Sequence, residues 1–114
     1  MAPGTDGSLA IYDEPSFVRL ADRLATASPT GRDVRAFGRL FYAQARRSEI
    51  DKQGRLRIPP ELSQWAALEN EMVLVGVGDH VEAWDTARWN AYTTERSARY
   101  DELAESAFSS EQGT

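Results

Sequence analysis

The chain has 114 residues, no cysteine, 41% hydrophobic residues and a formal net charge of −5. This size fits one small domain with a modest core, and the lack of cysteine excludes a disulfide framework and thiolate metal ligands. No apolar run approaches the length of a membrane span, and the first residues lack the basic and apolar regions of a signal peptide, so we expect a protein of the reducing cytoplasm.

The first third of the sequence predicts a short strand followed by two helices. Residues 8–12 alternate weakly in polarity, which indicates the strand, and Asp13 is a suitable N-cap for a helix whose first turn holds Pro15. Apolar residues then recur at helical spacing, at Phe17, Leu20, Ala21 and Leu24. Ser28-Pro-Thr-Gly31 breaks this helix, and a second one follows whose apolar face consists of Val34, Phe37, Leu40 and Phe41.

Residues 43–62 combine strand, turn and helix-start signals within a short stretch. The chain can run extended from about Ala43 to Ile50, and Asp51-Lys-Gln-Gly54-Arg55 then forms a charged turn that leads into a second strand. The Asp51 carboxylate can accept backbone N–H groups, and Gly54 can adopt the positive φ that a tight turn demands. Pro60 suits the first turn of a helix. We therefore expect a β-hairpin with a charged tip, followed at once by a helix.

The remaining residues predict a short helix, a strand pair and a last helix. The short helix covers residues 61–68, and the strands cover 72–77 and 81–84, with a turn at Gly78-Asp79-His80. Asp85 can cap the last helix, in which Trp89, Tyr92, Arg96 and Leu103 line one side. Residues 106–114 are polar and are expected to form a disordered tail.

The charge of the chain is segregated along the sequence. Residues 32–57 carry eight basic residues against three acidic ones, whereas the following 57 residues carry three arginines against eleven acids. A basic block between acidic flanks fits a protein that presents one face to a polyanion while the rest stays soluble. The alternative is that helix surfaces are simply Arg-rich on one side and Glu-rich on the other.

A short internal echo relates two parts of the chain at a spacing of 72 residues. An aromatic residue that ends a strand, an Asp cap and two core positions recur, as Tyr12-Asp13 with Phe17 and Leu20, and as Trp84-Asp85 with Trp89 and Tyr92. Chance is one explanation, because these residue types are common in such roles. If the echo reflects a repeat, the counterpart of the 51–55 turn falls before Met1.

These pieces together resemble the MraZ family of bacterial transcriptional regulators, whose two tandem units belong to the AbrB-like swapped-hairpin class. The family's Asp-x-x-x-Arg signature is matched by Asp51 to Arg55, followed by Ile58-Pro59 and Glu61-Leu62. Val73-Leu-Val-Gly76-x-Gly78 and Glu82-x-Trp84-Asp85 are similar to the family's second strand pair. The likeness covers roughly residues 7–104.

The resemblance implies an α+β fold: an AbrB-like swapped-hairpin β-barrel unit with flanking helices. Residues 43–105 would form a complete second unit, and residues 1–42 a strand and two helices that remain of a first unit. The family's first hairpin, with its own Asp-x-x-x-Arg, has no counterpart here. A start assigned too late, a truncated gene and pairing with another subunit are the three explanations that the sequence leaves open.

The candidate DNA-binding residues are basic side chains of the predicted hairpin, namely Lys52, Arg55, Arg57 and Arg47. A guanidinium suits bidentate contact with a phosphate or a guanine edge, which favours Arg55. The alternative for Arg55 is an ion pair with Asp51 that stiffens the turn, with Lys52 and Arg57 making the contacts. The structural residues of the motif are Asp51, Gly54 and Pro59.

No catalytic constellation is present in the sequence. Gly76-Val-Gly78 lacks the third glycine of a nucleotide loop and is followed by a strand pattern. His80 is the single histidine, so it is better interpreted as a turn residue than as a metal ligand. Trp65, Trp84 and Trp89 occupy positions that favour core packing over base stacking. We expect no enzyme activity, no cofactor, no metal and no small-molecule substrate.

The leading hypothesis is a sequence-specific DNA-binding regulator of the MraZ type. The resemblance implies double-stranded DNA with short direct repeats in a promoter as its partner, a homo-oligomer as its assembly, and a cytoplasmic, nucleoid-associated location. The alternative is a protein-interaction subunit that alters the assembly of related chains without reading DNA itself.

Overall fold

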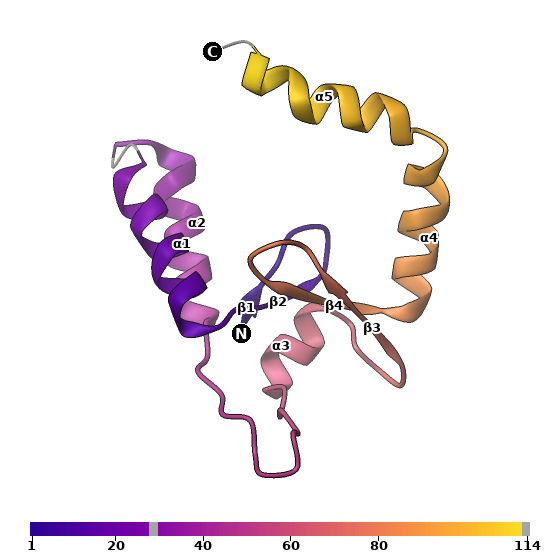
Figure 1. The fold of residues 1–114 in the computed structure, drawn as a ribbon. Helices are drawn as coiled ribbons and strands as arrows, with labels where there is room; N and C mark the ends of the chain where they lie inside the picture. The colour runs from indigo at the N-terminus through magenta and orange to yellow at the C-terminus, as the bar shows by residue number, and fades with distance from the viewer. Residues whose placement is uncertain (28–29, 113–114) are drawn as a thin grey trace.

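The structure is a computed structural model that describes residues 1–27 and 30–112. These residues form an α+β fold in which a small antiparallel sheet is flanked by helices, as expected. Figure 1 shows two helical arms leaving the sheet on opposite sides and a long loop projecting below it.

The sheet has the strand order β1-β2-β4-β3, and every neighbouring pair is antiparallel. Strands β2 (Leu9–Ile11), β3 (Met72–Gly76) and β4 (Val81–Asp85) lie where the sequence predicts them. Strand β1 (Ala2–Pro3) was not predicted, because two residues are too few to show an alternating pattern. The sheet is therefore made of two hairpins, β1-β2 and β3-β4, joined through β2 and β4.

The first arm consists of helices α1 (Glu14–Thr26) and α2 (Arg32–Gln44). Asp13 caps α1, because its carboxylate accepts a hydrogen bond from the backbone N–H of Ser16 at 2.8 Å. The two helices pack through aromatic rings, with the Phe17 and Phe41 centroids 5.8 Å apart. The predicted break at 28–31 falls between them, although residues 28 and 29 lie outside the described part of the chain.

Helix α3 (Pro60–Trp65) closes one face of the sheet and supplies the centre of the core. Leu62 has no exposed surface and packs with Leu9, Ala66 and Ala83. The predicted helix at 61–68 is correct in place but ends earlier. Trp65, expected in the core, is 46% exposed, and only its indole N–H bonds inward, to the Ser8 carbonyl oxygen at 3.2 Å.

The second arm consists of helices α4 (Thr86–Ser97) and α5 (Tyr100–Gln112), and it corrects two predictions. One continuous helix was expected after Asp85, but the chain breaks at Ala98 and Arg99. The predicted disordered tail is wrong for residues 106–112, which continue α5. Residues 113–114 lie outside the described part. The tail was misjudged because residues 106–114 contain two apolar residues, Ala107 and Phe108, which are too few to show a helical repeat.

Strands β2 and β4 are placed symmetrically about one residue pair. Their register aligns Leu9 with Ala83, Ala10 with Glu82 and Ile11 with Val81. Ala10 and Glu82 are 72 residues apart, which is the spacing of the echo in the sequence, so a local two-fold axis passes through this pair. Each strand also leads into a helix through an Asp cap, since Asp85 accepts the Arg88 N–H at 3.2 Å as Asp13 accepts that of Ser16.

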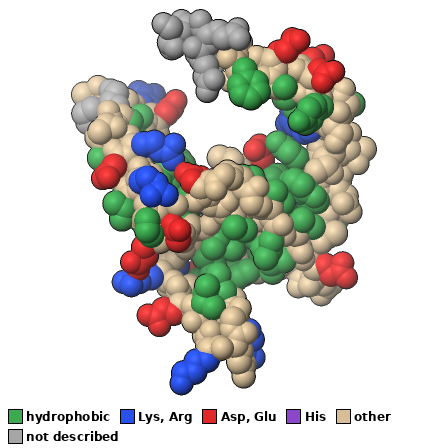
Figure 2. Space-filling view, viewed as in Figure 1, with side chains coloured by type: hydrophobic (Ala, Val, Ile, Leu, Met, Phe, Trp, Pro, Cys, Tyr) green, Lys and Arg blue, Asp and Glu red, His purple; other side chains and the backbone are tan. Residues whose placement is uncertain are grey.

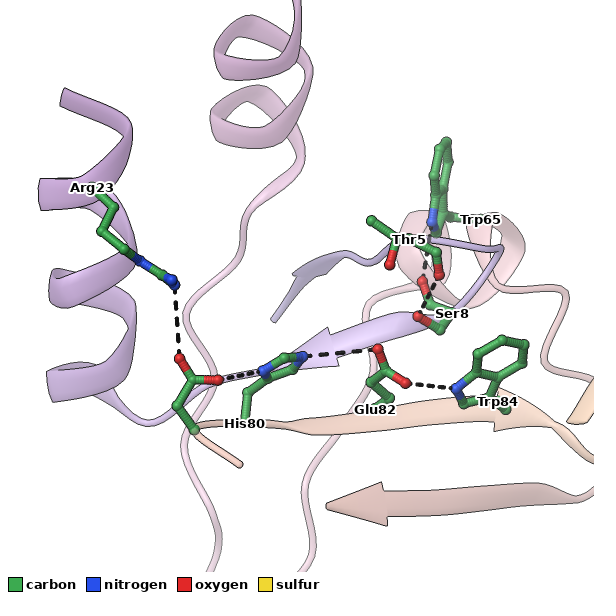
Figure 3. Close-up of polar contacts among 8 residues, drawn as sticks. Thr5, Ser8, Arg23, Trp65, His80, Glu82 and Trp84 are labelled. Atoms are coloured by element: carbon green, nitrogen blue, oxygen red, sulfur yellow. Dashed lines mark hydrogen bonds and ion pairs between the residues drawn. The ribbon is translucent and has the colours of Figure 1, made fainter. Parts of the chain in front are cut away.

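A row of polar contacts ties α1 to β4 (Figure 3). Arg23 pairs with Asp79 at 3.8 Å, and Nδ1 of His80 lies 2.8 Å from the same carboxylate. The hydrogen bond with His80 holds the pKa of Asp79 below its ordinary value. On the other side of the ring, Glu82 lies 3.8 Å from Nε2 and accepts the indole N–H of Trp84 at 3.0 Å. His80 is thus a turn residue, as predicted, in contact with both neighbouring carboxylates.

The protein is less compact than a typical domain of the same length. Its radius of gyration is 15.9 Å, whereas a compact domain of this size has a value of about 13 Å. Large hydrophobic side chains are exposed on both arms and on the sheet, and Figure 2 shows them gathered over the middle of the molecule and along α5. Among the described residues, no helix has the length and apolar character needed to cross a membrane.

Candidate nucleic-acid interface

The segment between α2 and α3, residues 45–59, projects from the body as an extended loop (Figure 1). The predicted β-strands on either side of its tip do not form, which corrects the expected hairpin. Within the loop, the backbone bonds are Asp51 N–H to the Arg55 carbonyl oxygen at 2.9 Å and, inside the turn, Gly54 N–H to the Asp51 carbonyl oxygen at 3.0 Å. At its base, Arg46 N–H bonds instead to the carbonyl oxygen of Met1. One pair of bonded residues is too little for a strand ladder.

The tip itself is a tight turn organised by one carboxylate. Asp51 Oδ1 accepts the backbone N–H groups of Gln53 at 2.9 Å and Arg55 at 2.8 Å. Its Oδ2 accepts Nε–H of Arg55 at 3.0 Å. Gly54 has φ +78°, a conformation in which a side chain would be strained. The residues predicted to shape the turn therefore meet there, and the backbone N–H of Arg55, with further hydrogen bonds, lowers the pKa of Asp51.

The basic residues at the tip point into solvent. Lys52, Arg55 and Arg57 are exposed, and Figure 2 shows lysine and arginine side chains around the projecting loop. Arg55 and Arg57 line one shallow depression of about 390 Å³, together with Glu49 and Asp51. Within the described part of the chain, Lys52 and Arg57 form no ion pair. Arg55 uses Nε for Asp51, and its side chain is 74% exposed.

Arg47 lies apart from this group. Its guanidinium pairs with the Glu14 carboxylate at the start of α1, although both side chains are largely exposed. Arg46 bonds to the carbonyl oxygens of Ala43 and Ala45, at the end of α2. The structure therefore brings three of the four predicted DNA-binding residues together and places the fourth at the base of the loop.

Sequence reasoning did not find an apolar groove between the loop and α1. The groove has a volume of about 590 Å³, and its apolar lining includes Ile11, Phe17, Val18, Ile50 and Leu56. Ile50 is 69% exposed although it adjoins the charged turn. An isoleucine beside a polar tip was the one local signal of this surface, since the other lining residues come from distant parts of the sequence.

Pro59 and Pro60 connect the loop to the core. Pro59 occupies the N-cap position of α3, and its carbonyl oxygen accepts the N–H groups of Leu62 and Ser63 at 3.1 and 3.0 Å. Pro60 occupies the first turn, where a missing N–H costs nothing. A short, stiff segment thus connects the charged tip to the buried Leu62. Within the described residues, no three His, Asp or Glu side chains gather as a metal site would require.

We expect the order of the tip to depend on pH in the acid range. Because hydrogen bonds lower the pKa of Asp51 in the folded chain below its usual 3.8, they stabilise the turn fully above that pH. The contribution is lost as the pH falls through the lowered folded-state pKa. The amide proton shifts of Gln53 and Arg55, measured by NMR, should follow this single titration. The variant Asp51→Asn should remove it, and a titration midpoint above 3.8 would contradict the assignment.

Comparisons with known proteins bear on the whole chain. The family model described as "MraZ protein, putative antitoxin-like" matches residues 41–110, which include the loop, α3, β3, β4 and α4. The chain is 38% identical to the transcriptional regulator MraZ of Finegoldia magna, with 90% of the chain and 71% of that protein covered. It is 40% identical to the protein of the same name from Heliobacterium modesticaldum, again over 90% of the chain and 71% of the relative.

A third relative, the transcriptional regulator MraZ of Lactiplantibacillus plantarum, is 43% identical over 90% of the chain and 72% of its own length. These relatives are named as regulators of transcription and not as enzymes. The likeness predicted from the 51–55 signature and the strand pair that follows is confirmed by both kinds of comparison. On the match over residues 41–110 and on these identities, the chain belongs to the MraZ family.

Proposed function

We propose that this protein is a transcriptional regulator that binds double-stranded DNA through the basic tip of the 45–59 loop. The observation that carries the proposal is the bracing of the tip by Asp51, which accepts three hydrogen bonds within five residues. A turn held in this way presents its cations without a large ordering cost on binding. The names of the relatives support regulation of transcription as the role.

In this proposal, the basic residues of the tip have different tasks. Lys52 and Arg57 contact phosphates, since they are exposed and form no ion pair with a described residue. Arg55 braces the turn through Nε, and its terminal amino groups remain available for a phosphate or a guanine edge. Arg47 contributes at the base of the loop only after release from Glu14.

One tip makes few contacts, so we propose that the protein binds promoter direct repeats as a homo-oligomer. Several tips on one assembly add their weak contacts through effective concentration. The open shape and the exposed hydrophobic side chains support self-association. Binding to DNA would place the protein on the nucleoid, in the cytoplasm.

We further propose that residues 43–105 form a complete AbrB-like swapped-hairpin unit and that residues 1–42 are the remaining part of another. The local two-fold axis through Ala10 and Glu82 supports two related units. In such a unit the extended segments beside Asp51 would gain strand partners from a related segment. That pairing would account for their lack of a ladder within this chain.

The test is the affinity for the chain's own promoter DNA as a function of salt concentration. Loss of a phosphate contact in Arg57→Ala should weaken binding on every sequence and reduce the salt slope by about one unit. Arg19→Ala on α1 is the matched control, since it removes an exposed arginine that is not part of the loop. It should change neither quantity.

Arg55→Ala separates the two tasks of Arg55. If the residue also contacts DNA, binding weakens while the circular dichroism spectrum is unchanged. If the turn itself fails, the Gln53 amide shift moves as it does in Asp51→Asn. An unchanged salt slope in both Arg55→Ala and Arg57→Ala, with the fold intact, would overturn the DNA-binding role of the loop.

A further inference from the structure

Helix α5 has an apolar stripe that the described chain does not cover. Its apolar residues recur at a spacing that aligns them on one side of the helix, at Tyr100, Leu103, Ala104, Ala107 and Phe108. Tyr100 is 73% exposed and Phe108 62% exposed. In Figure 1, α5 turns away from the end of α4 and lies apart from the sheet and from the first arm. A stripe of this kind is typical of a helix that packs on another surface.

The rest of the α5 surface is acidic. Asp101, Glu102 and Glu105 occupy the other side of the helix, and no lysine or arginine occurs in residues 100–112. Glu102 pairs with Arg99 at 3.1 Å, just before the helix. A surface that receives α5 should therefore combine exposed apolar side chains with positive charge.

Helix α2 has that combination on the side that faces away from α1. Phe41 packs inward on Phe17, whereas Leu40 is 64% exposed. Ala36 and Ala43 are exposed and lie beside Leu40 at helical spacing. Three exposed arginines flank this seam on α2, namely Arg32, Arg35 and Arg39.

We propose that α5 of one copy of this chain docks on the Leu40 seam of α2 in a second copy. The proposal rests on the self-association inferred above and names the surfaces that make it. Charge favours α2 over a second α5 as the surface that binds α5. Two packed α5 helices would bring acidic side chains together, whereas α5 on α2 brings acidic side chains beside arginines. The contact joins two different surfaces, so each copy in a first pair keeps one of its two surfaces free, and the assembly closes as a ring or extends as a chain.

Disulfide trapping tests the contact directly, since the chain has no cysteine of its own. The full chain with Leu103→Cys is mixed with the chain carrying Leu40→Cys, one lengthened by a tag, and oxidised. The mixed disulfide is expected as the main product. A main product of Leu103→Cys joined to itself would overturn the proposal. Leu74→Cys, 63% exposed on β3, is the control partner and should remain unlinked to Leu103→Cys.

Charge reversal supplies a second readout, the association constant measured by analytical ultracentrifugation. Asp101→Arg with Glu105→Arg in one chain, or Arg35→Glu with Arg39→Glu, should each cause about a tenfold loss of association. All four changes together should restore it, and Glu95→Arg on α4 should have no effect. Assembly that is indifferent to both reversals overturns the docking alone. A protein that stays monomeric overturns self-association as well, whereas promoter binding by the loop is tested separately by Arg57→Ala.

Discussion

Replacing Leu62 by alanine is expected to lower the free energy of unfolding by about 3 kcal/mol. Leu62 has no exposed surface and sits where α3 meets Leu9 and Ala83 of the sheet. Its removal leaves a cavity at the centre of a core that contains few large side chains, so little can move to fill it. The measurement is urea unfolding followed by circular dichroism at a fixed protein concentration.

Leu74→Ala is the matched control for Leu62→Ala. It removes the same atoms from a side chain on β3 that is 63% exposed, and a surface change of this kind alters stability by about 0.5 kcal/mol or less. Equal losses from the two variants would show that the centre of the core lies elsewhere than at the α3–sheet contact.

Trp84→Ala is expected to detach the second arm from the sheet and to cost about 4 kcal/mol. Trp84 is 4% exposed, and its ring centroid lies 5.3 Å from that of Trp89 and 4.9 Å from that of Tyr92. These two residues belong to α4 and pack it against the sheet. Its removal also leaves Glu82 without the indole N–H. Hydrogen exchange should accelerate at the α4 amides while those of α1 and α2 stay protected.

Trp65→Ala is the control for this change. Trp65 is 46% exposed and makes one hydrogen bond, to Ser8, so its loss should cost about 1 kcal/mol. Unchanged exchange at α4 in Trp84→Ala would contradict the role of Trp84 as the anchor of that helix.

The sequence predicted the parts of the fold that local chemistry decides. Asp13 and Asp85 were identified as caps because an Asp before an apolar repeat has few other uses, and both caps are present. The turn at Asp51 followed in the same way from a carboxylate and a glycine three residues later. In each case the bonding partners lie within four residues of the predicted one.

The wrong predictions concern residues whose structure depends on a partner that is distant in the sequence or is not supplied by this chain. The segments beside Asp51 have the composition of strands, but a strand forms only when a second segment completes its ladder. Pairing of Arg47 with Glu14 joins residues on separate elements, and nothing near either one signals it. The break at Ala98 contains neither glycine nor proline, so the end of α4 had no local marker.

The pairing of β2 with β4 also sets the order in which the sheet can be completed during synthesis. The β1-β2 hairpin emerges from the ribosome before β4, since the residues that pair with Leu9–Ile11 are made about 70 positions later. At a translation rate of about 5–20 residues per second, β2 waits roughly 4–14 s with one edge open. Three residues are a short edge to leave unpaired for that time. The brevity of β2 therefore limits misassembly between nascent chains.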